Sequence, residues 1–157
     1  MKVYIKFLLS IFSKSLFYVI SIMFSLIFIL NLLTELEFFK EIEVGIAFQI
    51  LLSLLNSPSM IFEMLPFIFL ITTQLFFIKL FNNNEIEIFK YSGLKNSNIL
   101  RIYSVITLIT AIILTIIFYN FSATFKKFYL DKKTKFTTDA KYLAVITKNG
   151  LWIKDEI

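Results

Sequence analysis

Two residue types are missing from this chain, and their absence narrows the chemistry it can perform. It has no cysteine, so it contains no disulfide framework and no thiolate metal site. It has no histidine, which removes the commonest general base and the commonest metal ligand. Nothing in the sequence resembles a phosphate-binding loop. We therefore expect no catalytic residue, no metal site and no cofactor, and no enzyme activity in the chain itself.

Charge is also missing from two long stretches. Residues 15–34 and 102–125 contain no Asp, Glu, Lys or Arg, and each is long enough to cross a hydrocarbon core, which takes roughly 20 helical residues. The chain is 58% hydrophobic, above the range of about 45–50% that is usual for soluble domains. A buried helix of a soluble protein seldom has such a long uncharged run. The sequence predicts a mainly α membrane protein.

The basic residues follow this pattern of segments. The net charge of +5 could indicate a nucleic-acid partner, but the lysines flank the apolar segments or gather in the last 32 positions, which hold 8 of the 16 basic residues. Membrane topology explains that distribution better, and we expect no nucleic-acid binding.

The predicted first span covers residues 15–34. The positions before it carry three lysines and no acid, and no small-residue cleavage site follows it, so it is expected to be an uncleaved anchor. Residues 35–43 hold four glutamates and one basic residue, Lys40. The positive-inside rule then places the N-terminus in the cytoplasm and this loop outside.

The second span is predicted at residues 58–81, after a short interfacial helix at residues 44–55. Ser57 is a suitable N-cap, and Pro58 suits the first helical position. A separate span over residues 44–62 is the alternative, but no cytoplasmic loop fits between it and the segment that follows.

Two residues early in the second span are of interest. Glu63 falls near the outer interface. An ionisable group at that depth indicates either a function or a side chain that snorkels to the aqueous phase. Pro66 removes one backbone hydrogen bond and is expected to kink the helix.

A third span is predicted at residues 98–122, which makes residues 1–123 the transmembrane region. Residues 124–157 read as the incomplete start of an extracytoplasmic β-domain, with strands near 142–146 and 151–153 joined by an Asn-Gly turn. A lone hairpin is marginal in water, so we expect a longer protein or a second chain to complete the sheet. Five lysines between positions 126 and 135 argue for the inside, but long flanking domains translocate largely regardless of charge.

A polar helix is predicted at about residues 83–93, between the second and third spans on the cytoplasmic side. Asparagines precede it, Glu85 and Glu87 lie in its first turn, where the helix dipole favours acids, and Gly93 suits its C-terminal cap. These acids could simply belong to a solvated face. A membrane protein that presents such a helix to the cytoplasm more often presents it to a partner.

Three short motifs resemble those of the LptF/LptG lipopolysaccharide export permease family. Residues 85–94 (EIEIFKYSGL) are similar to its cytoplasmic coupling segment, and Leu65-Pro66 is similar to the middle of its second span. Residues 149–155 (NGLWIKD) resemble a strand early in the extracytoplasmic domain of the LptG member. The resemblance extends over the whole chain, which would correspond to the N-terminal half of a family member. The motif at residues 149–155 favours LptG over LptF.

The resemblance implies six spans with a periplasmic jellyroll-like β-domain between the third and fourth. Two such permease subunits pair in the inner membrane, bind a cytoplasmic ABC ATPase dimer, and pass lipopolysaccharide from the membrane to a periplasmic bridge protein. Glu85 would be the acidic residue that docks into the ATPase, which would carry the ATPase activity. The first span would form part of a lateral gate for the lipid, with Lys40 and Glu63 possible residues of the lipid path.

This sequence departs from the family pattern in two respects. It holds only the first half of the expected layout. It also lacks a basic residue near the outer end of the first span, where some LptG proteins carry a lysine thought to meet lipid phosphates; residues 31–34 read Asn-Leu-Leu-Thr, and Lys40 is a weak substitute.

Other classes of function remain open. The chain could be the membrane subunit of another ABC-type transporter, since a different coupling helix would look similar. It could also be a small structural protein with three spans. A membrane enzyme is disfavoured because Glu63 is the only carboxylate near the interior of a predicted span.

Overall fold

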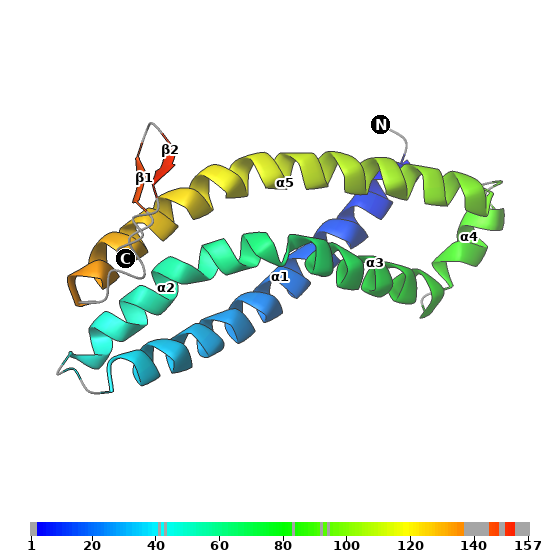
Figure 1. Ribbon diagram of the computed structural model, residues 1–157. Helices are drawn as coiled ribbons and strands as arrows, with labels where there is room; N and C mark the ends of the chain where they lie inside the picture. The colour runs from blue at the N-terminus through cyan, green and yellow to red at the C-terminus, as the bar shows by residue number, and fades with distance from the viewer. Residues whose placement is uncertain are drawn as a thin grey trace.

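The computed structural model describes residues 3–40, 42, 44–82, 84–91, 93, 95–136, 145–147 and 150–152. In chain order the helices are α1 (Val3–Phe38), α2 (Ile46–Glu63), α3 (Leu65–Asn82), α4 (Glu85–Tyr91) and α5 (Asn96–Lys133), followed by the short 3-10 helix η1 (Thr134–Phe136). Figure 1 shows an elongated arrangement in which α1 and α5 extend along most of its length. Helices α2 and α3 follow one another along the same direction, and α4 lies across one end.

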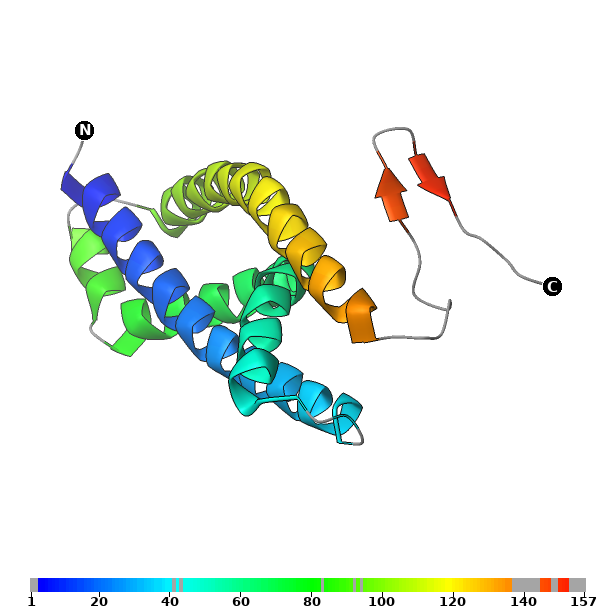
Figure 2. The ribbon, with the colours of Figure 1, turned by 90° about the vertical axis from the view of Figure 1, so that its left-hand side faces the viewer.

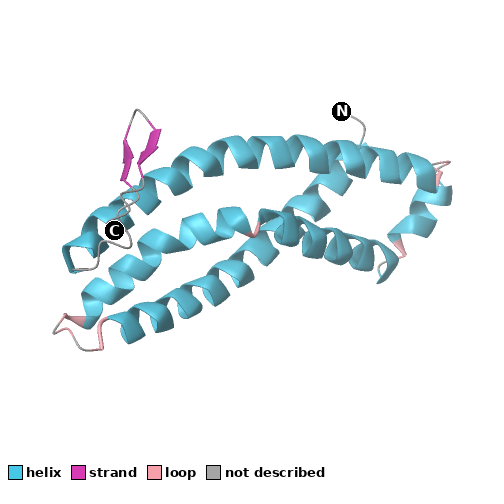
Figure 3. Ribbon diagram, in the orientation of Figure 1, coloured by secondary structure: helices cyan, strands magenta, loops and turns pink. Residues whose placement is uncertain are grey.

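Helices α2 and α3 form one interrupted path rather than two separate passages. Met64 alone separates them, and its N–H still donates to the carbonyls of Met60 and Ile61 at 3.1 Å. The carbonyl of Met64 in turn accepts from the N–H of Ile68 at 3.0 Å. Figure 3 marks the break as a short pink segment. It lies two residues before Pro66, near which the sequence predicted a kink, because proline has no N–H to continue the ladder.

The predicted helix start at Ser57 and Pro58 is wrong. Both residues lie inside α2, which is continuous through the expected interfacial helix. The hydroxyl of Ser57 donates to the carbonyl of Ser53 at 2.7 Å, so it does not cap a new helix. Both serines are fully buried, and small side chains of this kind allow helices to approach closely. This packing compensates for the hydrogen bond that Pro58 cannot donate.

Helix α5 extends beyond the span predicted at residues 98–122. Residues 124–133, expected to begin the extracytoplasmic tail, continue the helix to Lys133. Ser122 and Tyr129 are buried, while Lys126 and Lys133 make polar contacts with other helices. Because these positions share one helical face, the segment gains contacts by remaining helical.

Beyond η1, the described residues form two short strands, β1 (Val145–Thr147) and β2 (Gly150–Trp152). They pair antiparallel, with Val145 opposite Trp152 and Ile146 opposite Leu151. The expected turn residues Lys148 and Asn149 lie outside the described residues. A pair of three-residue strands is not a β-domain, so the fold is that of a mainly α protein.

Within the described part of the chain, four helices are long and apolar enough to cross a membrane: α1, α2, α3 and the helix that contains α5. Contacts between helices show which residues lie at the same level. At one end of the charge-free stretches, Lys79 of α3 contacts Ser15 of α1. At the other end, Asn31 of α1 contacts Ser57 of α2. Residues 57–79 of the interrupted path therefore lie level with residues 15–31 of α1.

Aromatic side chains hold the α4 end of the bundle together. Phe12 of α1 meets Phe76 of α3 edge to face, with ring centroids 6.5 Å apart, and meets Tyr103 of α5 at 5.7 Å. Phe76 stacks on Tyr103 at 4.4 Å, and the Tyr103 hydroxyl donates to the hydroxyl oxygen of Thr73 at 2.7 Å. We name Phe12, Phe76 and Tyr103 the aromatic cluster. The aromatic cluster joins α1, α3 and α5 at this level of the bundle.

We expect Phe76→Ala to destabilise the protein by about 3–5 kcal/mol, the usual cost of removing a buried phenylalanine ring. Phe76 is fully buried, whereas Phe81 of the same helix is 64% exposed. Thermal unfolding in detergent micelles measures the loss, with Phe81→Ala as the matched control. An equal loss in the two variants would contradict the role of the aromatic cluster.

Candidate coupling segment and polar cluster

The predicted polar helix is present as α4, a short helix across one end of the bundle (Figure 1). Asn84 precedes it with a positive φ of 54°, a conformation that asparagine tolerates. The carbonyl of Asn84 accepts from the N–H groups of Glu87 and Ile88 at 3.1 and 3.2 Å. Glu85 and Glu87 occupy the first turn, with Glu87 exposed and Glu85 partly buried.

The other end of α4 is closed by Gly93. Its φ of 81° lies in the left-handed region, where a glycine carries no steric penalty. Its N–H donates to the carbonyl of Lys90 at 2.9 Å, which stops the helix after Tyr91. The C-terminal cap that the sequence predicted at Gly93 is confirmed.

Helix α4 is attached to α1 through its apolar side. Phe89 is 7% exposed and meets the ring of Phe7 edge to face, with centroids 5.9 Å apart. Ile86 packs against the same core. Glu87, Ile88 and Tyr91 are left exposed. One face of α4 is therefore held by the bundle while another is available for contact.

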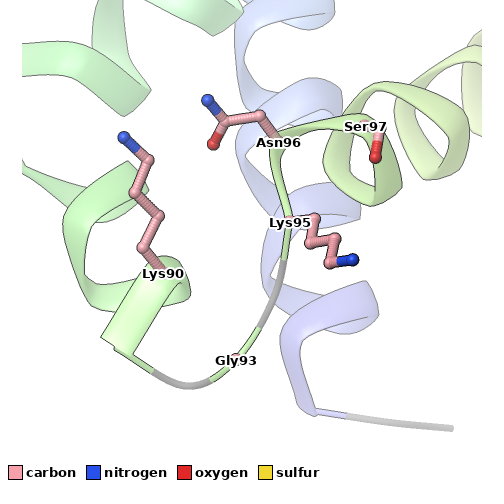
Figure 4. Close-up of a pocket in the computed structure, with 5 residues that line it drawn as sticks. All are labelled: Lys90, Gly93, Lys95, Asn96 and Ser97. Atoms are coloured by element: carbon pink, nitrogen blue, oxygen red, sulfur yellow. The ribbon is translucent and has the colours of Figure 1, made fainter.

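A shallow cavity of about 510 Å³ lies beside the end of α4, as Figure 4 shows. It is lined by Lys90, Gly93, Lys95, Asn96 and Ser97, and the side chain of Lys95 extends away from that of Lys90. Of the three residues predicted for coupling, only Gly93 lines it. Glu85 and Glu87 lie on the preceding turns of the helix.

Lys40 and Glu63, the two residues predicted for a lipid path, lie at different levels. Lys40 is exposed in the turn after α1, where its N–H donates to the Glu37 carbonyl at 3.3 Å. Glu63 is the exposed last residue of α2, directly before the break at Met64. It lies about 9 Å along the helix from Ser57, at 1.5 Å per residue. The structure does not bring the two residues together.

At the end of the bundle away from α4, polar side chains meet in its interior. Asn31 donates to the Ser57 hydroxyl at 3.3 Å, and Asn56 donates to the amide oxygen of Asn31 at 3.0 Å. The amide oxygen of Asn56 accepts from the ammonium of Lys126 at 2.7 Å. Asn31, Asn56 and Ser57 are buried, whereas Lys126 is partly buried. These hydrogen bonds therefore link α1, α2 and α5 in the interior of the bundle.

A second polar set joins α1 directly to α5. Glu35 is 1% exposed, and one of its carboxylate oxygens accepts from the Tyr129 hydroxyl at 2.8 Å. The Lys133 ammonium donates to both carboxylate oxygens at 2.9 and 3.0 Å. It also lies 4.3 Å from the centroid of the Phe38 ring.

We name these seven residues the polar cluster: Asn31, Glu35, Asn56, Ser57, Lys126, Tyr129 and Lys133. The sequence pattern assigns none of them to a site, because it explains the lysines as topological charges and Glu35 as part of a loop. The signal in the sequence was the helical spacing of these polar positions. Glu35 follows Asn31 by four residues, and Tyr129 and Lys133 follow Lys126 by three and seven. The same spacing explains why α1 runs past Glu35 to Phe38.

We expect Asn56→Ala to cost about 1–3 kcal/mol, because it leaves the buried amide oxygen of Asn31 and the ammonium of Lys126 without this partner. Asn120 is exposed on α5 and bonds only weakly to its own helix at 3.4 Å, so Asn120→Ala is the matched control. Thermal unfolding of both variants in micelles measures the difference. A control that falls as far as Asn56→Ala would rule out the buried network as the cause.

Comparison with known proteins gave a match that includes α2 to α5 and all of α1 but its first three residues. Residues 6–156 match the family model described as lipopolysaccharide export system permease LptF/LptG. Searches of curated proteins and of solved structures returned no match. A permease family accords with several long apolar helices and indicates a multi-pass membrane protein. Because the match covers nearly the entire chain, this protein belongs to the LptF/LptG family of lipopolysaccharide export system permeases.

Proposed function

We propose that the chain is a permease subunit of an ATP-driven exporter that extracts lipopolysaccharide from the inner membrane and passes it to a periplasmic bridge protein. Its partners are a cytoplasmic ABC ATPase dimer and a second permease subunit. The single observation that carries this proposal is the family match, extended by the geometry of α4.

Helix α4 has the form that a docking element requires. Its acidic first turn and Tyr91, which is 89% exposed, are available to a partner. Its other face is fixed through Phe89 to Phe7 of α1. A force applied to α4 would therefore reach α1 by direct contact. In this proposal Glu85 and Glu87 bind the ATPase, and Gly93 ends the helix so that the chain can enter α5.

The topology of the proposal follows from this assignment. The α4 end faces the cytoplasm together with the N-terminus, and the polar cluster faces the periplasm. Strands β1 and β2 then begin a periplasmic jellyroll-like domain. The resemblance of residues 149–155 to the LptG member supports an LptG-like subunit.

We expect Glu85→Ala to abolish co-purification of the complete protein with its cytoplasmic ATPase. Losing a charged contact that is buried at an interface costs about 2–5 kcal/mol. Glu37→Ala is the control, since Glu37 is an exposed glutamate at the opposite end of the bundle. Pull-down from membranes measures both variants, with Glu87→Ala as a second test of the same face.

Two results would count against the coupling role. If Glu85→Ala and Glu87→Ala both retain the ATPase at the level of the control, α4 is not the docking element. If the unaltered protein binds an ATPase that serves another cargo, the chain is the membrane subunit of a different ABC-type transporter.

The polar cluster supplies the positive charge that the sequence of the first span lacks. The Lys126 ammonium hydrogen-bonds the neutral amide of Asn56, and it lies over the ring of Tyr129, 5.2 Å from its centroid. It lines a cavity of about 370 Å³ together with Thr34, Phe38, Tyr129, Leu130, Lys133 and Thr134. We assign Lys126 the contact with lipid phosphates that a lysine near the outer end of the first span is thought to make in some LptG proteins, with Lys40 in a lesser role.

We expect Lys126→Gln to reduce lipopolysaccharide release from proteoliposomes, because the amide retains a donor for Asn56 but carries no charge. Lys127→Gln is the control, since Lys127 is exposed and one position away. ATP hydrolysis is measured in the same vesicles and should be retained. Equal release by the two variants would remove Lys126 from the lipid path.

A further inference from the structure

Helices α1 and α5 contact each other near both ends, and between these contacts a slot separates them. The slot has a volume of about 430 Å³. Its lining residues come from α1, α2 and α5: Ile20, Ser21, Phe24, Ser25, Pro58, Ile61, Phe118 and Phe121. Figure 2 shows α1 and α5 on either side of α2, which packs against both.

The contact at the α4 end is apolar and extensive. Phe12 of α1 lies against Tyr103 of α5, and Phe76 of α3 contacts both rings. Phe12 and Phe76 are almost completely buried. Close packing of three rings fixes this end of the slot without any charged group.

The contact at the other end combines one buried carboxylate with aromatic packing. The Lys133 ammonium lies over the ring of Phe38, and Phe39 meets Phe136 edge to face at 5.6 Å. Glu35 accepts hydrogen bonds from Tyr129 and Lys133, and both donors belong to α5. The link formed by Asn31, Asn56 and Lys126 instead passes through α2. Among the described residues of α1 beyond Asn31, Glu35 is thus the one whose side chain hydrogen-bonds α5 directly.

We propose that Glu35 is a positioning residue that holds the end of α1 against α5 and thereby sets the width of the slot. The assignment goes beyond the proposed function and does not depend on the identity of the cargo. Its basis is the cost of burying charge. The carboxylate of Glu35 is buried and is the charged acceptor that Tyr129 and Lys133 share, so its removal weakens the arrangement that buries all three groups.

Replacing Glu35 would weaken the contact between α1 and α5 at the polar cluster and leave the aromatic cluster in place. In Glu35→Gln the side chain keeps its size but loses its charge, so the Lys133 ammonium loses its carboxylate partner. Lys133, whose side chain is 18% exposed, keeps its hydrogen bond to the Tyr129 hydroxyl, but the charge attraction that draws α5 toward Glu35 of α1 is lost. The aromatic cluster at the far end is unaffected by this change.

Distances between spin labels test the proposal, and the absence of native cysteine makes the labelling specific. One pair, Leu33→Cys with Lys132→Cys, reports on the α1–α5 distance at the polar cluster. A second pair, Ser13→Cys with Ser104→Cys, reports on the aromatic cluster, because these residues adjoin Phe12 and Tyr103. All four positions are exposed. The complete protein is reconstituted into lipid nanodiscs and measured by double electron–electron resonance.

We expect Glu35→Gln to shift the distance at the polar cluster to longer values and to broaden it, while the distance at the aromatic cluster stays unchanged. Tyr129→Phe, which retains the ion pair, should give a smaller shift. Glu37→Gln, an exposed neighbour on the same helix, should give none.

Two results would overturn the proposal. An unchanged distance at the polar cluster in Glu35→Gln would show that other contacts position α1. A change at both label pairs would show that Glu35 supports the fold as a whole rather than one end of the slot. The pair at the aromatic cluster therefore also reports whether the variant has folded.

Discussion

The buried carboxylate of Glu35 joins the end of α1 to the far end of α5, beside the aromatic contacts of Phe38 and Phe39. A charge that has left water must be compensated within the protein, and here Tyr129 and Lys133 provide the compensation. The same requirement explains the neighbouring amides of Asn31 and Asn56, which bond to each other and to Lys126. These polar contacts, together with the apolar cluster of Phe39, Leu52 and Tyr129, determine how α1, α2 and α5 meet at this end.

The two ends of the bundle are built from different interactions. Stacked and edge-to-face rings of Phe12, Phe76 and Tyr103 make a dry contact at the α4 end, whereas hydrogen bonds and an ion pair join the other end. Ring packing persists whatever the local charge, but an ion pair can exchange its partner for water or for another ion. In the proposed mechanism, the aromatic end would transmit force from α4 and the polar end would change its separation.

Helix α5 explains why such a change is feasible. Most of its apolar side chains are exposed along the described helix, and only a narrow stripe of them packs against α2 and α3. In a membrane those exposed side chains are satisfied by lipid or by another subunit, so they do not hold α5 to α1. The proposed paired permease would cover part of this surface, and the slot beside Phe118 and Phe121 would remain open toward lipid.

The sequence by itself determined the mainly α membrane class, the position of α4 and the glycine that ends it. Charge-free length, helix-dipole preferences and glycine conformation are local properties. Short motifs in the sequence also indicated the family. It misplaced the start of a helix at Pro58 and the end of α5, because tertiary packing overrode local signals there. Only the tertiary structure brought Glu35 to Lys133, 98 positions away. Periodicity shows on which face of a helix a residue lies. The partner of a buried charge depends on how the helices pack, which periodicity does not show.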